Sequence, residues 1–131
     1  MENILNKNYT YAIIGASTDE TKFGFKVLKQ LTDAGYKTVP INPKKEPILG
    51  QVTHKNLRTL RQAVDVAVFV TQPKITEQIL KTMNGKVNKV WLQPGSENEE
   101  SIKFCEENNI FCIHNACIMI AQANEAVEAV I

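Results

Sequence analysis

Residues 9–17 of the chain read Tyr-Thr-Tyr-Ala-Ile-Ile-Gly-Ala-Ser. A short apolar run rich in β-branched residues and ended by a glycine is typical of a strand buried on both sides in a parallel sheet. A helix should follow, because apolar residues then recur with the spacing of one helical face: Phe23, Val27, Leu28 and Leu31. The segment therefore predicts a strand followed by a helix that packs on the sheet, the first half of a βαβ unit.

The same alternation continues along the chain. Strands are expected at Tyr9–Ile14, Tyr36–Ile41, Asp65–Val70, Asn88–Leu92 and Ile110–Ile113, with a further short strand near Val52. Three later helices are expected. One has the apolar face Ile75, Ile79, Leu80 and Met83, one opens with the capping-box pattern Ser96-x-x-Glu99, and the last covers Asn115–Ile131. The pattern predicts an α/β fold, a Rossmann-like doubly wound parallel sheet, in a single domain over residues 1–131.

Composition and charge exclude several classes of protein. With 131 residues, 44% of them hydrophobic, the chain can bury a core without a metal or disulfides. Its 15 Lys and Arg residues are balanced by 14 Asp and Glu, so no overall field favours nucleic acid or an anionic membrane. Residues 1–8 are too polar for a signal-peptide core, and no stretch approaches the roughly 18 apolar residues of a spanning helix. We expect a cytoplasmic protein that binds neither nucleic acid nor a membrane. The sequence is compatible with a homo-oligomer and with a protein partner, and it selects neither.

The three cysteines, Cys105, Cys112 and Cys117, include no Cys-x-x-Cys pair. This pattern favours neither a disulfide framework nor a zinc site, and no metal is expected. Cys105 and Cys112 are expected to face the core, as is Trp91. His114 precedes Cys117 by three residues, and an imidazole beside a thiol can activate it. We nevertheless interpret this pair as structural and name no catalytic residue.

A ligand is expected at one edge of the sheet, since ligands of open parallel sheets bind outside the carboxyl ends of the strands. The loops at that edge are Gly15–Gly24, Asn42–Lys45, Thr71–Pro73 and Gln93–Ser96. In the first loop, a glycine after a strand lets backbone N–H groups and the next helix N-terminus approach a phosphate. The loop does not follow the dinucleotide pattern G-x-G-x-x-G, because the next glycine after Gly15 is Gly24. A simple tight turn is the structural alternative.

The second loop helps to separate cofactors. NAD sites place a carboxylate after the second strand to accept hydrogen bonds from a ribose hydroxyl. Here the loop has no carboxylate before Glu46, and Lys44 and Lys45 could neutralise a phosphate on the ribose. Coenzyme A and NADP both carry such a phosphate. The alternative is that both lysines are ordinary solvated charges.

A family resemblance extends from about Tyr9 to Ile120. It is carried, in chain order, by Gly15-Ala16-Ser17, Pro40-Ile41-Asn42-Pro43, Ile48-Leu49-Gly50, Val64-Asp65-Val66-Ala67-Val68-Phe69, Trp91-Leu92-Gln93-Pro94-Gly95 and Asn115-Ala116-Cys117-Ile118. These motifs resemble those of the bacterial stand-alone CoA-binding domain family. That family is similar to the N-terminal CoA-binding domain of the succinyl-CoA synthetase α subunit. The resemblance implies a Rossmann-like fold that holds coenzyme A.

The resemblance also implies positions for parts of the ligand. The diphosphate would lie near Gly15, Ala16 and Ser17 and near the start of the next helix at Lys22 and Phe23. The phosphorylated ribose would lie near Asn42, Pro43 and Lys44, and the rest of the groove would be lined by Thr71, Gln72, Pro73, Gln93 and Gly95. The chain departs from the family pattern at Glu20 and Lys22, where relatives carry proline and arginine, and at Gly24, where they carry a small hydroxylated residue.

Three functions are compatible with such a fold. The sequence favours a non-catalytic module that binds coenzyme A or an acyl-CoA. An NADP-dependent oxidoreductase or redox sensor is the alternative, although the chain lacks G-x-G-x-x-G and a substrate domain. A phosphoacceptor signalling domain would need an aspartate at the carboxyl end of a strand, whereas Asp65 starts its predicted strand.

Overall fold

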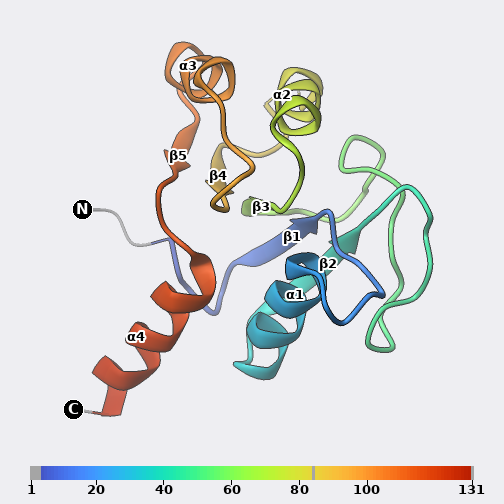
Figure 1. Cartoon of the computed structure of the whole chain (residues 1–131), viewed down its shortest axis with the longest axis vertical. Helices are drawn as coiled ribbons and strands as arrows, with labels where there is room; N and C mark the ends of the chain where they lie inside the picture. The colour runs from blue at the N-terminus through green and yellow to red at the C-terminus, as the bar shows by residue number, and fades with distance from the viewer. Residues whose placement is uncertain (1–3, 84, 131) are drawn as a thin grey trace.

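The computed structural model describes residues 4–83 and 85–130. In this part of the chain, five parallel strands form one sheet in the order β2-β1-β3-β4-β5. The strands are β1 (Thr10–Ile14), β2 (Lys37–Ile41), β3 (Val66–Phe69), β4 (Lys89–Leu92) and β5 (Phe111–Ile113). The helices are α1 (Phe23–Asp33), α2 (Pro73–Thr82), α3 (Glu99–Glu107) and α4 (Ile118–Val130). Figure 1 shows α2 and α3 on one face of the sheet and α1 and α4 on the other. The predicted Rossmann-like doubly wound α/β fold is confirmed.

Strand β1 lies between β2 and β3 and contributes to both cores of the molecule. Tyr11 and Ile13 belong to the apolar cluster under α1 and α4, whereas Ala12 and Ile14 belong to the cluster under α2 and α3. All four are at most 2% exposed. Because both faces of the strand are covered, its sequence is continuously apolar instead of alternating with polar residues.

Residues typical of helix termini lie at the ends of α1 and α2: Gly35 follows α1 with a φ of 92°, and Pro73 is the first residue of α2. The predicted core positions of Trp91, Cys105 and Cys112 are confirmed. Trp91 is 4% exposed, and its Nε1 donates a hydrogen bond to the carbonyl oxygen of Ala116 (2.9 Å), so this side chain packs in the core as expected. Cys105 is fully buried, and Cys112 packs partly buried against the same cluster. Each of the five strands begins one residue later than predicted.

The predicted capping box is wrong. Asn98, not Ser96, caps α3, and its Oδ1 accepts a hydrogen bond from the backbone N–H of Ser101 (2.8 Å). The Ser96 hydroxyl instead donates to the carbonyl oxygen of Gln93 (2.7 Å) and closes the turn after β4. An asparagine is as good a cap as a serine, and the Ser-x-x-Glu spacing carried no information about which one the chain uses.

The short strand expected near Val52 is also wrong. Val52 is 73% exposed, and its neighbourhood forms only isolated bridges, from Ile41 to His54 and from Ile48 to Gln51. A β-branched residue in a polar loop has no sheet face to cover, so its strand propensity decides nothing there.

Helix α4 begins at Ile118, three residues after the predicted Asn115. The backbone of Asn115 has a φ of 60°, a left-handed conformation that a right-handed helix cannot contain. The predicted last residue, Ile131, lies outside the described residues. None of the described helices is long and apolar enough to cross a membrane.

Two residues that were expected to pack on the sheet do not do so. Phe23 is 62% exposed and Ile75 is 44% exposed. Both lie in the first turn of a helix, α1 or α2, that starts beyond the carboxyl ends of the strands. Their spacing is that of the buried helix face, but the first turn of each helix lies past the ends of the strands, so no strand lies beneath these two side chains. They border open space at the edge of the sheet, where a ligand is expected.

The start of α1 is held against the end of β1 by a contact between two glycines. A Cβ added to Gly24 would lie 2.0 Å from the carbonyl oxygen of Gly15, and a Cβ added to Gly15 would lie 2.3 Å from the carbonyl oxygen of Val70. Gly15 also has a φ of 93°. The strand, the turn and the helix N-terminus can approach this closely only because neither residue has a side chain.

We expect Gly24→Ala to destabilise the fold. Overpacking usually costs about 1–3 kcal/mol, which should outweigh the roughly 1 kcal/mol by which a helix favours alanine over glycine. The measurement is urea unfolding, with a lower midpoint at an unchanged m-value. Lys29→Gly and Lys29→Ala, at an exposed position of the same helix, measure helix propensity alone and should show alanine as the more stable. A Gly24→Ala variant at least as stable as the unmodified protein would contradict the close contact.

Candidate ligand-binding groove

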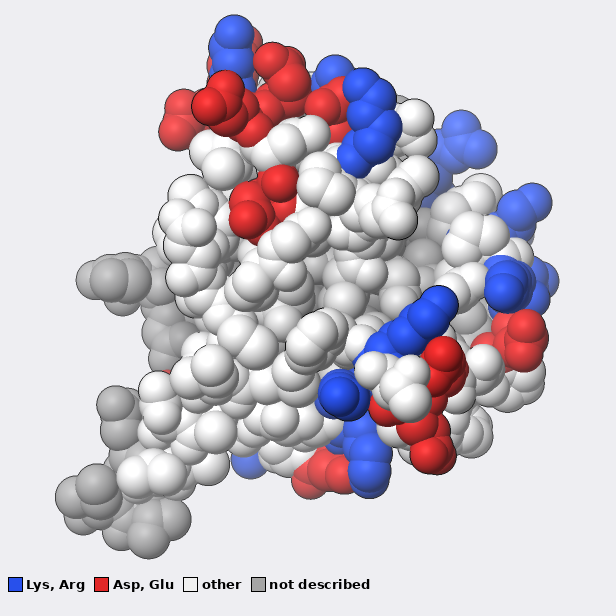
Figure 2. Space-filling model, in the orientation of Figure 1, with Lys and Arg blue, Asp and Glu red and all other residues white. Residues whose placement is uncertain are grey.

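Three adjoining hollows lie at the carboxyl edge of the sheet, where the connections after β1 and β3 lead to opposite sides. We name each after one residue of its lining: the Cys117 arm (about 490 Å³), the Ser17 arm (about 230 Å³) and the Arg58 arm (about 440 Å³). Gly15 lines all three arms, and Thr71 lines both the Cys117 arm and the Arg58 arm. Figure 2 shows this face with a central hollow bordered by Lys and Arg side chains. The arms form one branched groove centred on Gly15.

The Ser17 arm is built from the turn after β1 and the loop after β2. The side-chain amide of Asn42 donates to the carbonyl oxygen of Ala16 (2.7 Å), which ties the two loops together. The backbone N–H of Gly15 donates to the carbonyl oxygen of Ile41 (3.1 Å). Because the two loops are linked by side-chain and backbone hydrogen bonds, a ligand would meet a preformed surface there.

The N-terminus of α1 faces the groove without a side-chain cap. Lys22 occupies the cap position in an extended conformation and makes no capping hydrogen bond, and Phe23 and Gly24 of the first turn line the Cys117 arm. The N-terminus of a helix carries roughly half a positive charge from its aligned peptide dipoles. Together with the ammonium group of Lys22, this end of α1 suits a phosphate group.

The carboxylates of the first loop are directed elsewhere. Asp19 accepts hydrogen bonds from the hydroxyl (2.7 Å) and the backbone N–H (2.9 Å) of Thr21, and these two bonds lower the pKa of Asp19. Neither Asp19 nor Glu20 lines any of the three arms. The carboxylate that does border the groove is Glu46, in the lining of the Ser17 arm.

The Cys117 arm is mainly apolar and is closed at one end by the start of α4. Gln93 is 4% exposed there, and its side chain makes two contacts. Its Nε2 donates to the Sγ of Cys117 (3.4 Å), and its Oε1 accepts from the backbone N–H of Ile118 (2.7 Å). Gln93 therefore acts as the cap of α4 and orients the thiol toward the arm.

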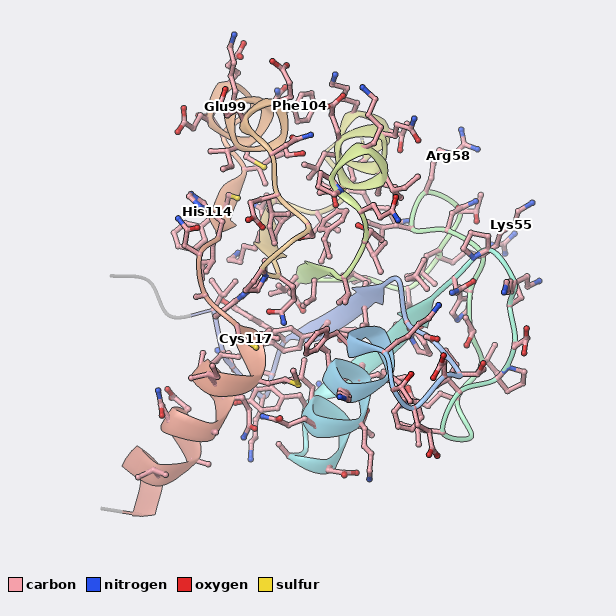
Figure 3. All side chains as sticks on the ribbon, in the orientation of Figure 1. Lys55, Arg58, Glu99, Phe104, His114 and Cys117 are labelled. Carbon is pink, nitrogen blue, oxygen red and sulfur yellow. The ribbon has the colours of Figure 1, made fainter. Side chains whose placement is uncertain are left out.

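The structure does not bring His114 and Cys117 together as a catalytic pair. The thiol of Cys117 contacts an amide, not an imidazole, and Figure 3 shows the two labelled side chains apart. The buried Nδ1 of His114 has no hydrogen-bond partner among the described residues. Within the same part of the chain, no group of three or more His, Cys, Asp or Glu side chains is arranged to hold a metal ion.

The structure brings almost all the predicted site residues to this groove. The Cys117 arm contains Gly15, Lys22, Phe23, Thr71, Gln72, Gln93 and Gly95; the Ser17 arm adds Ala16, Ser17, Asn42 and Lys44; and the Arg58 arm adds Pro43. Pro73 lines none of the three arms and serves as the first residue of α2.

Sequence reasoning missed several residues of the groove. Lys55, Leu57 and Arg58 come from the long segment between β2 and β3, which has neither helical nor strand periodicity. Nothing in their pattern indicates that they fold back over the carboxyl end of β2. Gly24 could have been recognised as a close-contact glycine, as the third glycine of a dinucleotide-binding turn is, although its spacing differs.

Comparison with known proteins identifies the family of the chain. The sequence model of the CoA binding domain matches residues 9–123. The chain belongs to the CoA binding domain family. This domain is 28% identical to the uncharacterized protein YneT of Bacillus subtilis over 127 residues, which cover 94% of this chain and 92% of YneT.

Structural and ligase relatives are also found. The CoA binding domain described here resembles a solved conserved hypothetical protein from Pyrococcus furiosus, with a TM-score of 0.82 and 35% identity over 86% of this chain and 98% of that chain. It is 36% identical over 75 residues to the ADP-forming acetate–CoA ligase of Methanocaldococcus jannaschii. That match covers 57% of this chain but only 11% of the ligase, so it relates the domain to a small part of a much larger enzyme.

Proposed function

We propose that this protein binds coenzyme A or an acyl-CoA non-covalently, as a single domain over residues 1–131, and catalyses no reaction by itself. The observation that carries the proposal is the uncapped N-terminus of α1 beside Gly15, at the point where the arms of the groove meet. If the diphosphate of the ligand lay at this point, the two parts of the ligand that it joins would extend into different arms of the groove. Family membership and the relation to acetate–CoA ligases support coenzyme A as that ligand.

Each part of coenzyme A has a suitable region of the groove. The diphosphate would lie against the Gly15–Ser17 turn and the start of α1, where backbone N–H groups and Lys22 are available. The pantetheine chain would follow the apolar Cys117 arm past Phe23, whose exposed ring it would cover. The nucleoside end would extend toward Asn42 and Pro43.

The loop after β2 supports a ligand with a phosphate on its ribose. The side-chain oxygen of Asn42 accepts a hydrogen bond from the backbone N–H of Lys44 (2.9 Å). The backbone carbonyl oxygen of Asn42 accepts one from the backbone N–H of Lys45 (3.0 Å), so the loop is a compact turn. Lys44 lines the Ser17 arm, and Lys45 does not. NADP satisfies the same charge argument and remains the alternative, for an oxidoreductase or redox sensor.

A binding role without catalysis is supported by the contacts at the end of the groove. The thiol of Cys117, the one nucleophilic sulfur in the lining of the three arms, accepts a hydrogen bond from the amide of Gln93. An amide cannot remove the proton of a thiol, so this contact orients the sulfur and supplies no general base to it.

The identity of the ligand can be measured directly. Isothermal titration calorimetry should show tighter binding of coenzyme A than of NADPH, NADH or ATP, because only coenzyme A carries a pantetheine chain for the mainly apolar Cys117 arm. Tighter binding of NADPH would replace the proposal with the oxidoreductase alternative.

Lys44 provides a test of the ribose phosphate. Charge-assisted hydrogen bonds contribute about 1.5–3 kcal/mol, so Lys44→Ala should weaken coenzyme A binding by roughly ten- to a hundredfold, and by less if solvent screens the contact. Binding of dephospho-coenzyme A, which lacks the 3′-phosphate, should change little. Lys45→Ala, next in the chain but outside the groove lining, controls for general loss of positive charge. Equal weakening of both ligands by Lys44→Ala would contradict a contact to the 3′-phosphate.

The position of Cys117 leads to a chemical test of the ligand's orientation. If the pantetheine follows the Cys117 arm, incubation with coenzyme A disulfide should form a mixed disulfide: the Cys117 thiolate attacks one sulfur, and one molecule of coenzyme A leaves as thiol. Intact-mass analysis should show this adduct in the unmodified protein and not in Cys117→Ser. Unmodified mass throughout, or an adduct that persists in the variant, would count against the orientation.

A further inference from the structure

The Arg58 arm differs in chemistry from the other arms of the groove. Its lining is apolar along α2 and the end of β2, with Ile41, Ile75 and Ile79 among its residues. Its two charged lining residues are Lys55 and Arg58, and no Asp or Glu belongs to the lining. The lining of the Ser17 arm, by comparison, contains Glu46 as well as Lys22 and Lys44. The charged residues that line the Arg58 arm are therefore all cations, and they border an apolar slot.

The segment that carries these two cations is firmly held. The backbone of His54 pairs with the end of β2, donating to the carbonyl oxygen of Pro40 (3.0 Å) and accepting from the N–H of Asn42 (2.9 Å). Lys55 is the next residue. A cation that follows a backbone pairing of this kind has a defined place beside the loop after β2.

Arg58 is positioned by a turn of its own. Asn56 Oδ1 accepts from both the backbone N–H (2.9 Å) and the hydroxyl (2.8 Å) of Thr59. Leu57 is 3% exposed and anchors the turn in the core. The ammonium group of Lys86 donates to the carbonyl oxygen of Arg58 (3.3 Å) and to that of Leu60. The backbone is thus fixed, while the guanidinium group is exposed.

Neither cation is neutralised by the protein in the part of the chain that the structure describes. The ion pairs found there involve Lys29, Lys74, Lys81 and Lys103 with acidic residues of their own helices. Figure 3 shows Lys55 and Arg58 extending from the segment between β2 and β3, and Figure 2 shows Lys and Arg side chains along that border of the hollow. Both side chains are available to an anionic ligand.

The boundary between two arms indicates where that anion would be. Pro43 lines the Arg58 arm, and the next residue, Lys44, lines the Ser17 arm. A ribose beside Pro43 would have its base in the apolar slot and a ribose-bound phosphate between Lys44 on one side and Lys55 and Arg58 on the other. The planar guanidinium of arginine can donate two parallel hydrogen bonds to such a phosphate.

We propose that Lys55 and Arg58 contact the ribose phosphate of the bound nucleotide from the side opposite to Lys44, and that they contribute to the preference for a phosphorylated ribose. The inference rests on the proposed function and deepens it. It assigns the discrimination between coenzyme A and dephospho-coenzyme A to residues from the segment between β2 and β3, in addition to the loop after β2.

The test compares four proteins: the unmodified chain, Lys55→Ala, Arg58→Gln and the control Arg61→Ala, which removes an exposed charge from the same segment outside the arm. Each is titrated by calorimetry with coenzyme A, dephospho-coenzyme A and adenosine 3′,5′-bisphosphate. Arg58→Gln should weaken coenzyme A and the bisphosphate by about tenfold and leave dephospho-coenzyme A nearly unchanged. Lys55→Ala should act in the same direction, and Arg61→Ala should change none of the three.

The outcomes separate this inference from the proposed function. If coenzyme A binds but its preference over dephospho-coenzyme A is the same in Lys55→Ala and Arg58→Gln as in the unmodified chain, the inference is wrong and the proposed function stands. If coenzyme A does not bind, the proposed function fails, and the titration with adenosine 3′,5′-bisphosphate then tests the inference by itself. Weakening of its binding by Arg58→Gln supports the arm as a nucleotide site, and absence of binding overturns it.

Discussion

The contact between Gly15 and Gly24 is the constraint on which the rest of the site depends. The carbonyl oxygen of Gly15 lies 2.0 Å from the point where a side chain of residue 24 would begin, so α1 can start directly against the turn after β1. This brings an uncapped helix N-terminus to the centre of the groove. Any side chain at residue 24 would displace the helix and, with it, the positive end of its dipole.

The order of the strands gives this contact its functional meaning. Since β2 lies on one side of β1 and β3 on the other, the loops after β1 and β3 lead away from each other, and the groove opens between them. Gly15, at the end of β1, therefore borders every arm. A Cβ on Gly15 would lie 2.3 Å from the carbonyl oxygen of Val70, so little space remains between the ends of β1 and β3 at that opening.

The candidate site was largely predictable where it consists of short turns directly after strands. The Gly15–Ser17 turn, Asn42 and Gln93 each follow an apolar run, and parallel strands bring their carboxyl ends to one edge whatever their spacing in the chain. Lys55 and Arg58 were not predictable, because an aperiodic segment carries no local signal of the backbone pairing that directs it over β2. Cys117 follows the last strand, so its place in the groove agrees with a Rossmann-like strand order; only its hydrogen bond from Gln93, 24 residues earlier, has no signal in the sequence.

Local patterns were sufficient for the alternation of strands and helices, the doubly wound sheet and the polar edge, because burial on one or both faces imposes a period that can be recognised in the chain itself. They were not sufficient to predict which residues in the first turn of a helix are buried. Phe23 and Ile75 have the spacing of core residues, yet both are exposed to the groove because α1 and α2 begin beyond the last residues of the strands. Where a helix starts relative to the edge of a sheet depends on loop geometry and on contacts between distant residues, and these exist only in the folded chain.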